Sequence, residues 1–282
     1  MHDLSGRAIA VTGAGSGIGR ALALNLAKRG AKLALADKDE AGLFETSRLL
    51  GNYPHFADSF DVTDHGRLES WIDRAVSEYG ALNGIINNAG LSVVAPFADC
   101  PKEDFDRVMA VNFDAVVAGC RLALPHIRGA DRGWIVNISS VFGMMGYPTQ
   151  SAYNASKYAV RGLTEAMYLE LAQTDPHVSV IRVHPGGIKT NVARNAKFIR
   201  GLDGSTLALD SGDAFEKAAK TTPEQAAEII VRGMEQGQHR VLIGPDARMI
   251  DWITRLAPVR YFGIIGRFLG GGNRKVASAK PS

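Results

Sequence analysis

The chain has 282 residues, of which 46% are hydrophobic and 22% are charged, and its net charge is +3. This length allows one large α/β domain with a full core, and so small a net charge gives no case for a nucleic-acid partner. The two cysteines, Cys100 and Cys120, make neither a metal motif nor a disulfide framework, and the seven histidines are scattered singly. We therefore expect no metal site and a reducing, cytoplasmic location.

Membrane insertion is not expected either. Met1 to Arg7 is polar, and the apolar run that follows enters a glycine turn rather than a cleavage site. The chain has no uninterrupted apolar run of about 18 residues, so no transmembrane span is predicted.

The first predicted elements are a strand, a glycine-rich loop and a helix. Ala8 to Val11 is an apolar strand that runs into Thr12-Gly13-Ala14-Gly15-Ser16-Gly17-Ile18-Gly19, and a helix is expected from Arg20 to Arg29. This order is the context that a phosphate-binding turn requires, because glycines let the backbone approach a pyrophosphate and the helix N-terminus offers free N–H groups.

The second predicted strand, Lys32 to Ala36, ends at Asp37. A carboxylate at this position can accept hydrogen bonds from both hydroxyls of an adenosine ribose and would repel a 2′-phosphate. Asp37 therefore predicts a preference for NAD. Lys38 follows it directly, and a cation there would tolerate the phosphate of NADP.

Strands and helices then alternate along the chain. Further strands are expected at residues 55–60, 84–86, 135–140, 178–183 and 240–243, and helices at 64–79, 105–127, 153–171 and from Pro223 onward. Repeated strand–helix pairs predict a doubly wound parallel sheet, Rossmann-like, in a single domain, with the ligand at the carboxyl ends of the strands.

Tyr153 and Lys157 lie four residues apart, so in a helix both project from one face, one turn apart. Free tyrosine has a pKa of about 10, and a neighbouring ammonium lowers it, which makes the phenol a better proton carrier at neutral pH. Ser140 ends a strand that leads toward this helix and can donate a hydrogen bond to the same oxygen. The three groups suit alcohol–carbonyl interconversion if a cofactor carries the hydride.

At this point the chain resembles the short-chain dehydrogenase/reductase family. The resemblance extends from about Gly6 to Thr190, and its motifs stand in the family's order: Thr12-Gly13-x-x-x-Gly17-Ile18-Gly19, Asn87-Asn88-Ala89-Gly90, Asn112, Ser140, Tyr153-x-x-x-Lys157 and Pro185-Gly186.

The resemblance implies a catalytic role for four residues. Tyr153 would be the acid/base, and Lys157 would bind the nicotinamide ribose and lower the pKa of Tyr153. Ser140 would orient the substrate oxygen, with Ser139 as the weaker candidate. Asn112 would hold a water that links Lys157 to solvent.

The resemblance also implies an NAD site. Asp61 and Val62 would contact adenine, while Ile188 and Thr190 would contact the carboxamide. The expected cofactor-binding residues are Gly13, Ser16, Gly17, Ile18, Gly19, Asp37, Asp61, Val62, Asn88, Ala89, Gly90, Tyr153, Lys157, Pro185, Gly186, Ile188 and Thr190.

The last third of the chain is less regular. Residues 189–222 lack clear periodicity, and a stretch of this length is typical of a lid or of a disordered loop; we expect a substrate lid. We expect residues 1–245 to form the dinucleotide-binding and catalytic domain, lid included, and residues 246–282 to form an amphipathic extension with a polar tail.

The extension, Met249 to Leu269, holds too many large apolar residues to leave in water and too many arginines to span a membrane. Packing on its own domain is the first expectation. A contact in a homodimer or homotetramer is the second, and a peripheral lipid surface is the third.

The segment between Ser140 and Tyr153 is rich in apolar side chains that would line the substrate site. We therefore expect an NAD-preferring oxidoreductase that interconverts a secondary alcohol and its ketone on a small hydrophobic substrate of steroid, lipid-derived or aromatic type. The alternatives are an NADP-dependent carbonyl reductase and a non-catalytic dinucleotide-binding scaffold.

Overall fold

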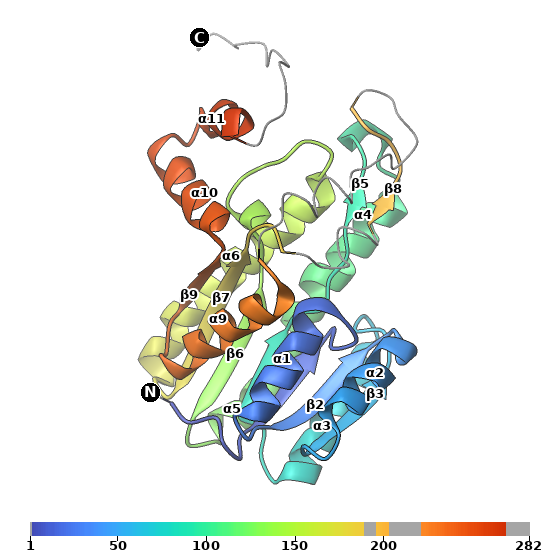
Figure 1. Ribbon diagram of the computed structural model, residues 1–282, viewed down its shortest axis with the longest axis vertical. Coiled ribbons are helices and arrows are strands. Elements are labelled where there is room, and N and C mark those ends of the chain that lie inside the picture. The colour runs from blue at the N-terminus through green and yellow to red at the C-terminus, as the bar shows by residue number, and fades with distance from the viewer. Residues whose placement is uncertain (1, 189–195, 203–220, 269–282) are drawn as a thin grey trace.

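The computed structural model describes residues 2–188, 196–202 and 221–268. Its centre is a sheet of seven parallel strands in the order β3-β2-β1-β4-β6-β7-β9 (Figure 1). The strands are β1 (Ala8–Thr12), β2 (Lys32–Asp37), β3 (His55–Ser59), β4 (Gly84–Asn87), β6 (Gly133–Ile138), β7 (Val178–Pro185) and β9 (Arg240–Ile243). The predicted doubly wound parallel sheet is therefore confirmed.

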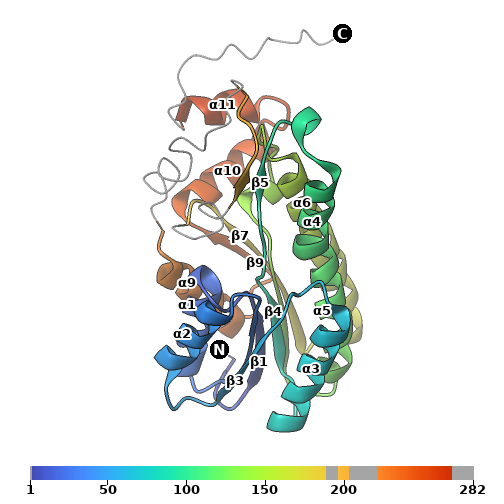
Figure 2. The ribbon, with the colours of Figure 1, turned by 90° about the vertical axis from the view of Figure 1, so that its right-hand side faces the viewer.

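Helices cover both faces of the sheet (Figure 2). The helices are α1 (Gly17–Lys28), α2 (Glu40–Leu50), α3 (His65–Tyr79), α4 (Lys102–Met109), α5 (Ala115–Arg128), α6 (Ser151–Thr174), α9 (Pro223–Glu235), α10 (Pro245–Leu256) and α11 (Tyr261–Phe268). One core cluster joins α1, α2 and α9 to the sheet, and a second joins α3, α5 and α6 to its other face. Strands covered on both faces read as continuous apolar runs, and every residue of β1 and β6 is buried.

The order of the strands reverses between β1 and β4, which pair in parallel although β2 and β3 lie between them in sequence. In open α/β sheets, ligands bind at the carboxyl ends of the strands on either side of such a reversal. The glycine loop after β1 and the Asn88 turn after β4 both lie there.

Three local features differ from the sequence-based prediction. The expected helix at 105–127 is divided by a π-helical turn, Ala110–Asp114, between α4 and α5. Helix α2 was not predicted. A second, two-stranded sheet pairs β5 (Val93–Val94) with β8 (Lys197–Phe198), which lie far apart in sequence.

The predicted lid is described only in part. Residues 196–202 and 221–222 of the 189–222 segment belong to the described chain, and the remainder lies outside it. Lys197 in β8 forms an ion pair with Asp104 in α4, with Nζ 2.7 Å from Oδ2. This part of the segment is thus attached beside β5 and α4.

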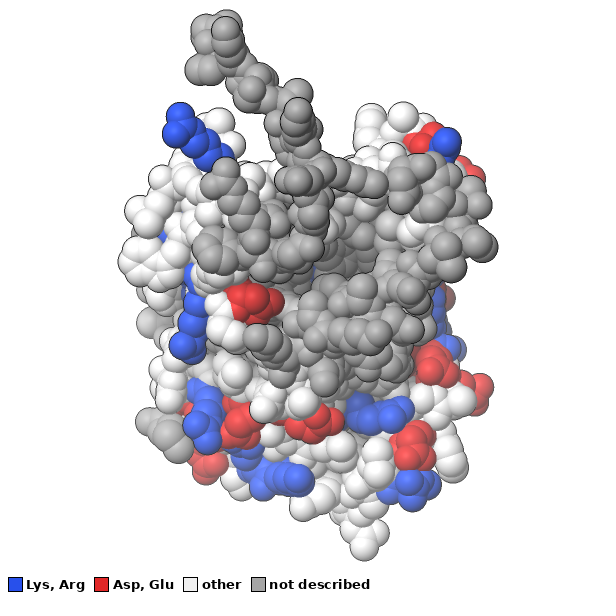
Figure 3. All heavy atoms as spheres, turned by 45° about the horizontal axis from the view of Figure 1, so that its top comes forward, with Lys and Arg blue, Asp and Glu red and all other residues white. Residues whose placement is uncertain are grey.

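One helical run, Lys102–Arg128, is long and apolar enough to cross a membrane by length and composition alone. Its apolar residues are accounted for by the core, because Val116, Cys120 and Ala123 pack against the sheet in the second core cluster. A buried core helix of a soluble protein passes the same test. On the face seen in Figure 3, acidic and basic side chains are interspersed rather than gathered by sign.

The C-terminal extension packs on the same domain along its inner face. Ala247 and Ile250 of α10 are buried in a cluster with Val141, Met144 and Ile265. The outer face of α10 is different, since Trp252 and Leu256 are exposed. The extension thus packs on its own domain, as first expected, along the inner face of α10.

A buried polar ladder crosses the sheet from β4 to α6. Asn87 Nδ2 donates to Asn137 Oδ1 at 2.8 Å, and Asn137 Nδ2 donates to Thr164 Oγ1 at 3.0 Å. Asn137 and Thr164 are fully enclosed. Buried polar groups cost free energy when they are unpaired. The two hydrogen bonds therefore hold β4, β6 and α6 in one alignment.

We predict that Asn137→Ala lowers the free energy of unfolding by about 2 kcal/mol or more, since it removes one hydrogen bond from each of the buried side chains Asn87 and Thr164 and opens a small cavity. Urea unfolding of the variant and of Asn52→Ala, the same substitution in an exposed turn, measures the difference. Equal stability of the two variants would contradict the role given to the ladder.

Candidate active site

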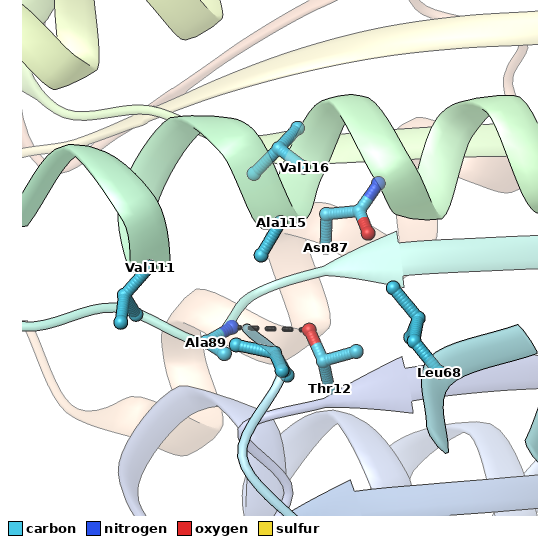
Figure 4. Close-up of a pocket in the computed structure, with 8 residues that line it drawn as sticks. Thr12, Leu68, Asn87, Ala89, Val111, Ala115 and Val116 are labelled. Atoms are coloured by element: carbon cyan, nitrogen blue, oxygen red, sulfur yellow. Dashed lines mark hydrogen bonds between the residues drawn. The ribbon is translucent and has the colours of Figure 1, made fainter. Parts of the chain in front are cut away.

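The glycine loop is joined to the Asn88 turn by a compact set of hydrogen bonds. Thr12 Oγ1 accepts from the backbone N–H of Asn88 at 3.1 Å and of Ala89 at 3.2 Å (Figure 4). In return, Asn88 Nδ2 donates to the carbonyl oxygens of Thr12 and Gly13, at 3.0 and 3.1 Å. The loops after β1 and β4 are therefore held at a fixed separation.

Two of the predicted glycines are required by this close approach. Gly13 has a φ of +68°, and a Cβ there would lie 2.8 Å from Ala89 Cα. A Cβ at Gly19 would overlap the carbonyl oxygen of Gly13. Gly13 is therefore required by both its backbone conformation and the available space, and Gly19 by the available space alone.

Helix α1 begins at Gly17, within the glycine loop, and Ile18 follows in its first turn. This turn carries no acidic residue. Ser16 is its N-cap, yet its side chain makes no capping hydrogen bond. The hydroxyl of Ser16 and the first N–H groups of α1 thus remain available to an anion, and a helix N-terminus favours negative charge. These residues fit a pyrophosphate.

The carboxylate of Asp37 stands at the end of β2, against the glycine loop. Its Oδ2 accepts from the N–H of Gly15 at 2.8 Å, and its Oδ1 accepts from the N–H of Asp39 at 2.9 Å. These bonds fix the Asp37 side chain beside the glycine loop. An acidic residue at this sequence distance from such a loop is the one that typically binds the ribose of a dinucleotide. Lys38 is exposed.

Asp61 and Val62 follow β3 on the same edge of the sheet. The carboxylate of Asp61 accepts from Thr63 and forms an ion pair with Arg107 of α4. Burial would raise the pKa of Asp61, but the hydrogen bonds from Thr63 and Arg107 outweigh it and lower the pKa. Asp61 is therefore charged and held toward α4.

Val62 lines a small pocket together with side chains from β1, β4, α3 and α5. Figure 4 shows these side chains around the hydrogen bond between Thr12 and Ala89, and the lining residues are Thr12, Val62, Leu68, Asn87, Ala89, Val111, Ala115 and Val116. The pocket is far too small for a dinucleotide.

Ser140, Tyr153 and Lys157 meet at the carboxyl end of β6, as the sequence predicted. Lys157 Nζ lies 5.6 Å from the ring centroid of Tyr153 and donates to the carbonyl oxygen of Ile138 at 2.9 Å. The hydroxyl of Ser139 instead donates to the carbonyl oxygen of Lys157 at 2.9 Å. Ser139 thus has a structural partner, while Ser140 faces the phenol.

The pKa values of the pair differ from the sequence-based expectation. Burial raises the pKa of Tyr153 to about 12, and a hydrogen bond with Ser140 acts in the opposite direction. Burial lowers the pKa of Lys157 to about 8. Loss of water therefore disfavours the charged form of both groups.

Asn112 lies on the π-helical turn and is fully buried. Its side chain accepts from the N–H of Leu91 and donates to the carbonyl oxygen of Leu91, both at 2.9 Å, and it also donates to Ser156 at 3.1 Å. A Cβ at Gly90 would lie 3.2 Å from Asn112 Oδ1 and 3.6 Å from Lys157 Nζ. Asn112 therefore lies beside Lys157, and the π-turn brings it there.

The predicted Pro185 is the last residue of β7, Gly186 begins the turn that follows, and Ile188 is buried. Thr190 lies outside the described residues. Sequence reasoning missed Asp246, whose Oδ2 accepts from the N–H of Gly187 at 2.5 Å. Asp246 comes from the first turn of α10, so the extension holds the turn on which the nicotinamide end would rest.

His184 is the second residue that sequence reasoning gave no role. It is fully buried, and its Nδ1 lies 2.9 Å from the carbonyl oxygen of Ser140. Burial lowers its pKa to about 4, so the ring is neutral at pH 7. A neutral ring that donates from Nδ1 fixes the backbone of Ser140.

The fold and this site define a dinucleotide-dependent oxidoreductase with a serine–tyrosine–lysine centre. The family model for short chain dehydrogenases matches residues 7–198, and the chain belongs to that family. It is 43% identical over 265 residues to the putative oxidoreductase SadH of Mycobacterium tuberculosis, covering 93% of this chain and 94% of that protein.

Two further comparisons bear on chemistry. The chain is 33% identical over 214 residues to cyclopentanol dehydrogenase of Comamonas sp., covering 73% of this chain and 84% of that protein. A short-chain dehydrogenase/reductase from Burkholderia phymatum, solved in complex with NAD, superposes with a TM-score of 0.81 at 27% identity and covers 95% of this chain and 97% of its own.

We predict that His184 makes stability depend on pH. Its folded pKa of about 4 lies below the free value of 6.5, so the neutral form is favoured in the folded state. The stability that this contributes is fully present above pH 6.5 and is lost as the pH falls toward 4, by about 3 kcal/mol.

Urea unfolding at pH 7.5, 6 and 5 measures this slope, and His184→Asn, which keeps a donor toward Ser140, is the comparison. The variant should show a smaller loss of stability between pH 7.5 and 5 than the wild type. The same loss in both proteins would assign the slope to other groups.

Proposed function

We propose that this protein is an NAD-dependent dehydrogenase that interconverts a hydrophobic secondary alcohol and its ketone. The observation that carries the proposal is the meeting of Ser140, Tyr153 and Lys157 at the carboxyl end of β6, on the edge of the sheet that also carries the glycine loop. The hydroxyl of Ser140 lies close enough to the phenol to lower the pKa of Tyr153. Both can therefore reach one substrate oxygen.

The groove between the loops fits NAD by its chemistry. The turn around Gly13 and the N-terminus of α1 suit a pyrophosphate, and the carboxylate of Asp37 suits a free ribose diol. NAD, when bound, accepts or supplies the hydride. The NAD complex of the Burkholderia relative supports the same cofactor.

The chain's own residues handle the proton. In oxidation, Tyr153 acts in its phenolate form: it takes the proton as the alcohol O–H bond breaks, a hydride leaves the carbinol carbon and the C=O bond forms. In reduction, protonated Tyr153 gives its proton to the carbonyl oxygen as the carbon gains the hydride. Ser140 steadies that oxygen in both directions, and Lys157 donates hydrogen bonds beside it.

An apolar substrate is supported by the side chains around the phenol. Phe142 packs edge-on against Tyr153, with ring centroids 6.0 Å apart. The name of the related cyclopentanol dehydrogenase records activity on a cyclic secondary alcohol, the same substrate class. A scaffold role on this fold is less well supported, because it would leave the half-buried Tyr153 and the buried Lys157 without a use.

The first functional prediction is that Tyr153→Phe lowers kcat by about a hundredfold or more, because it removes the proton carrier. Binding of NADH, followed by its fluorescence, should persist. Tyr158→Phe, on the same helix but partly exposed at 42%, is the matched control and should keep its activity. Wild-type turnover by Tyr153→Phe on an accepted alcohol would exclude the assignment.

The second functional prediction is a preference for NAD over NADP that depends on Asp37. Asp37→Ala should reduce the ratio of kcat/KM for NAD to kcat/KM for NADP by about tenfold or more, since it removes both the ribose contact and the repulsion of the 2′-phosphate. Glu40→Ala, an exposed acid nearby, should leave the ratio unchanged. A wild-type protein that prefers NADP would redirect attention to Lys38.

A further inference from the structure

A row of aromatic rings leads from the candidate catalytic tyrosine to the last described helix. Tyr153 meets Phe142 edge to face, and Phe142 stacks on Tyr147 with centroids 5.2 Å apart and an angle of 12°. Tyr147 in turn meets Phe262 of α11 at 6.4 Å and 62°. Rings from three separate segments therefore make one continuous row.

The middle of this row is held rigidly by Asn154, the neighbour of Tyr153. Its Nδ2 donates to the carbonyl oxygens of Phe142 and Met145, at 2.8 and 2.7 Å, and its Oδ1 accepts from the N–H of Tyr147 at 3.0 Å. The segment that follows Ser140 is thus fixed to α6 by three hydrogen bonds.

Helix α11 is attached to the same segment in two ways. The hydroxyl of Tyr261 accepts from the N–H of Gly146 at 3.0 Å. Ile265 is buried in the cluster that includes Val141, Met144 and Met145. The position of Phe262 relative to Tyr147 is therefore set by bonds and packing on both sides of it.

The rings of Phe142, Tyr147 and Phe262 are not fully buried in the core. Tyr147 is 42% exposed, and Phe142 and Phe262 are only partly buried. Partly exposed aromatic faces that begin at a proton-transferring phenol are suited to bind an apolar molecule whose reacting oxygen sits at that phenol.

We propose, resting on the function proposed above, that α11 supplies one wall of the substrate pocket and that Phe262 determines specificity for long apolar substrates. A small alcohol would reach only Phe142, next to Tyr153. A substrate with a longer apolar chain or a larger ring system would extend along Tyr147 to Phe262 and gain contact area there. The C-terminal extension is then part of substrate recognition.

The test is a series of 2-alkanols, from 2-butanol to 2-dodecanol, oxidised with NAD. In the wild type, kcat/KM should rise with chain length, because each buried methylene adds about 0.8 kcal/mol of transfer free energy. In Phe262→Ala, the ratio of kcat/KM for 2-dodecanol to that for 2-butanol should fall about tenfold, since losing part of an apolar contact typically costs 10-fold or more.

Trp252→Ala is the matched control, because Trp252 belongs to the same extension but is 66% exposed on the outer face of α10. Its ratio should equal that of the wild type. Phe262→Leu should fall between Phe262→Ala and the wild type, which separates loss of a contact from unfolding of α11. Equal ratios in wild type and Phe262→Ala would overturn the proposal, and so would the same tenfold fall in Trp252→Ala.

Direct binding separates this proposal from the proposed function. Calorimetric titration of the NADH-bound protein with 2-dodecanol and 2-butanol needs no turnover. If the wild type oxidises no alcohol but binds 2-dodecanol through Phe262, the pocket stands and the proposed reaction fails. If it oxidises alcohols with no contribution from Phe262, the reaction stands and the wall is wrong.

Discussion

The hydroxyl of Thr12 joins the two halves of the sheet where the strand order reverses. It is 4% exposed and receives hydrogen bonds from the N–H groups of Asn88 and Ala89. The glycine loop lies on one side of Thr12. On the other side the chain continues from Ala89 to Gly90, which lies close to Asn112 and Lys157. The distance between these two sides sets where a bound cofactor would lie relative to Tyr153. The hydrogen bonds of Thr12 help to fix that distance.

Burial shifts the pKa values of the proposed centre, and hydrogen bonds hold it rigidly. Removal of water disfavours the charged forms of Tyr153 and Lys157, and the backbone carbonyl of Ile138 replaces part of the lost solvation of the lysine. Neutral His184 and the ladder through Asn137 hold the surrounding backbone with hydrogen bonds of their own. The centre is thus preorganised before any ligand arrives, which is what transition-state stabilisation requires.

Strand–helix alternation, the glycine loop and the Ser140, Tyr153 and Lys157 set were all predictable, because each depends on residues close in sequence or at a strand end. The pairing of β5 with β8, the contact between Gly187 and Asp246 and the row from Tyr153 to Phe262 were not, because each joins distant segments whose local patterns do not specify a partner. The π-turn at Asn112 was missed because a helical period does not reveal one additional residue. The pKa of Tyr153 was misjudged because sequence shows the nearby charge but not the loss of water.

The two ends of the described chain lie at opposite poles of the molecule (Figure 1). The backbone N–H of His2 donates to Glu235 at 2.6 Å near the amino ends of the strands, whereas α11 lies beyond their carboxyl ends. An affinity tag or a surface tether joined at the N-terminus would therefore lie far from the aromatic row between Tyr153 and Phe262.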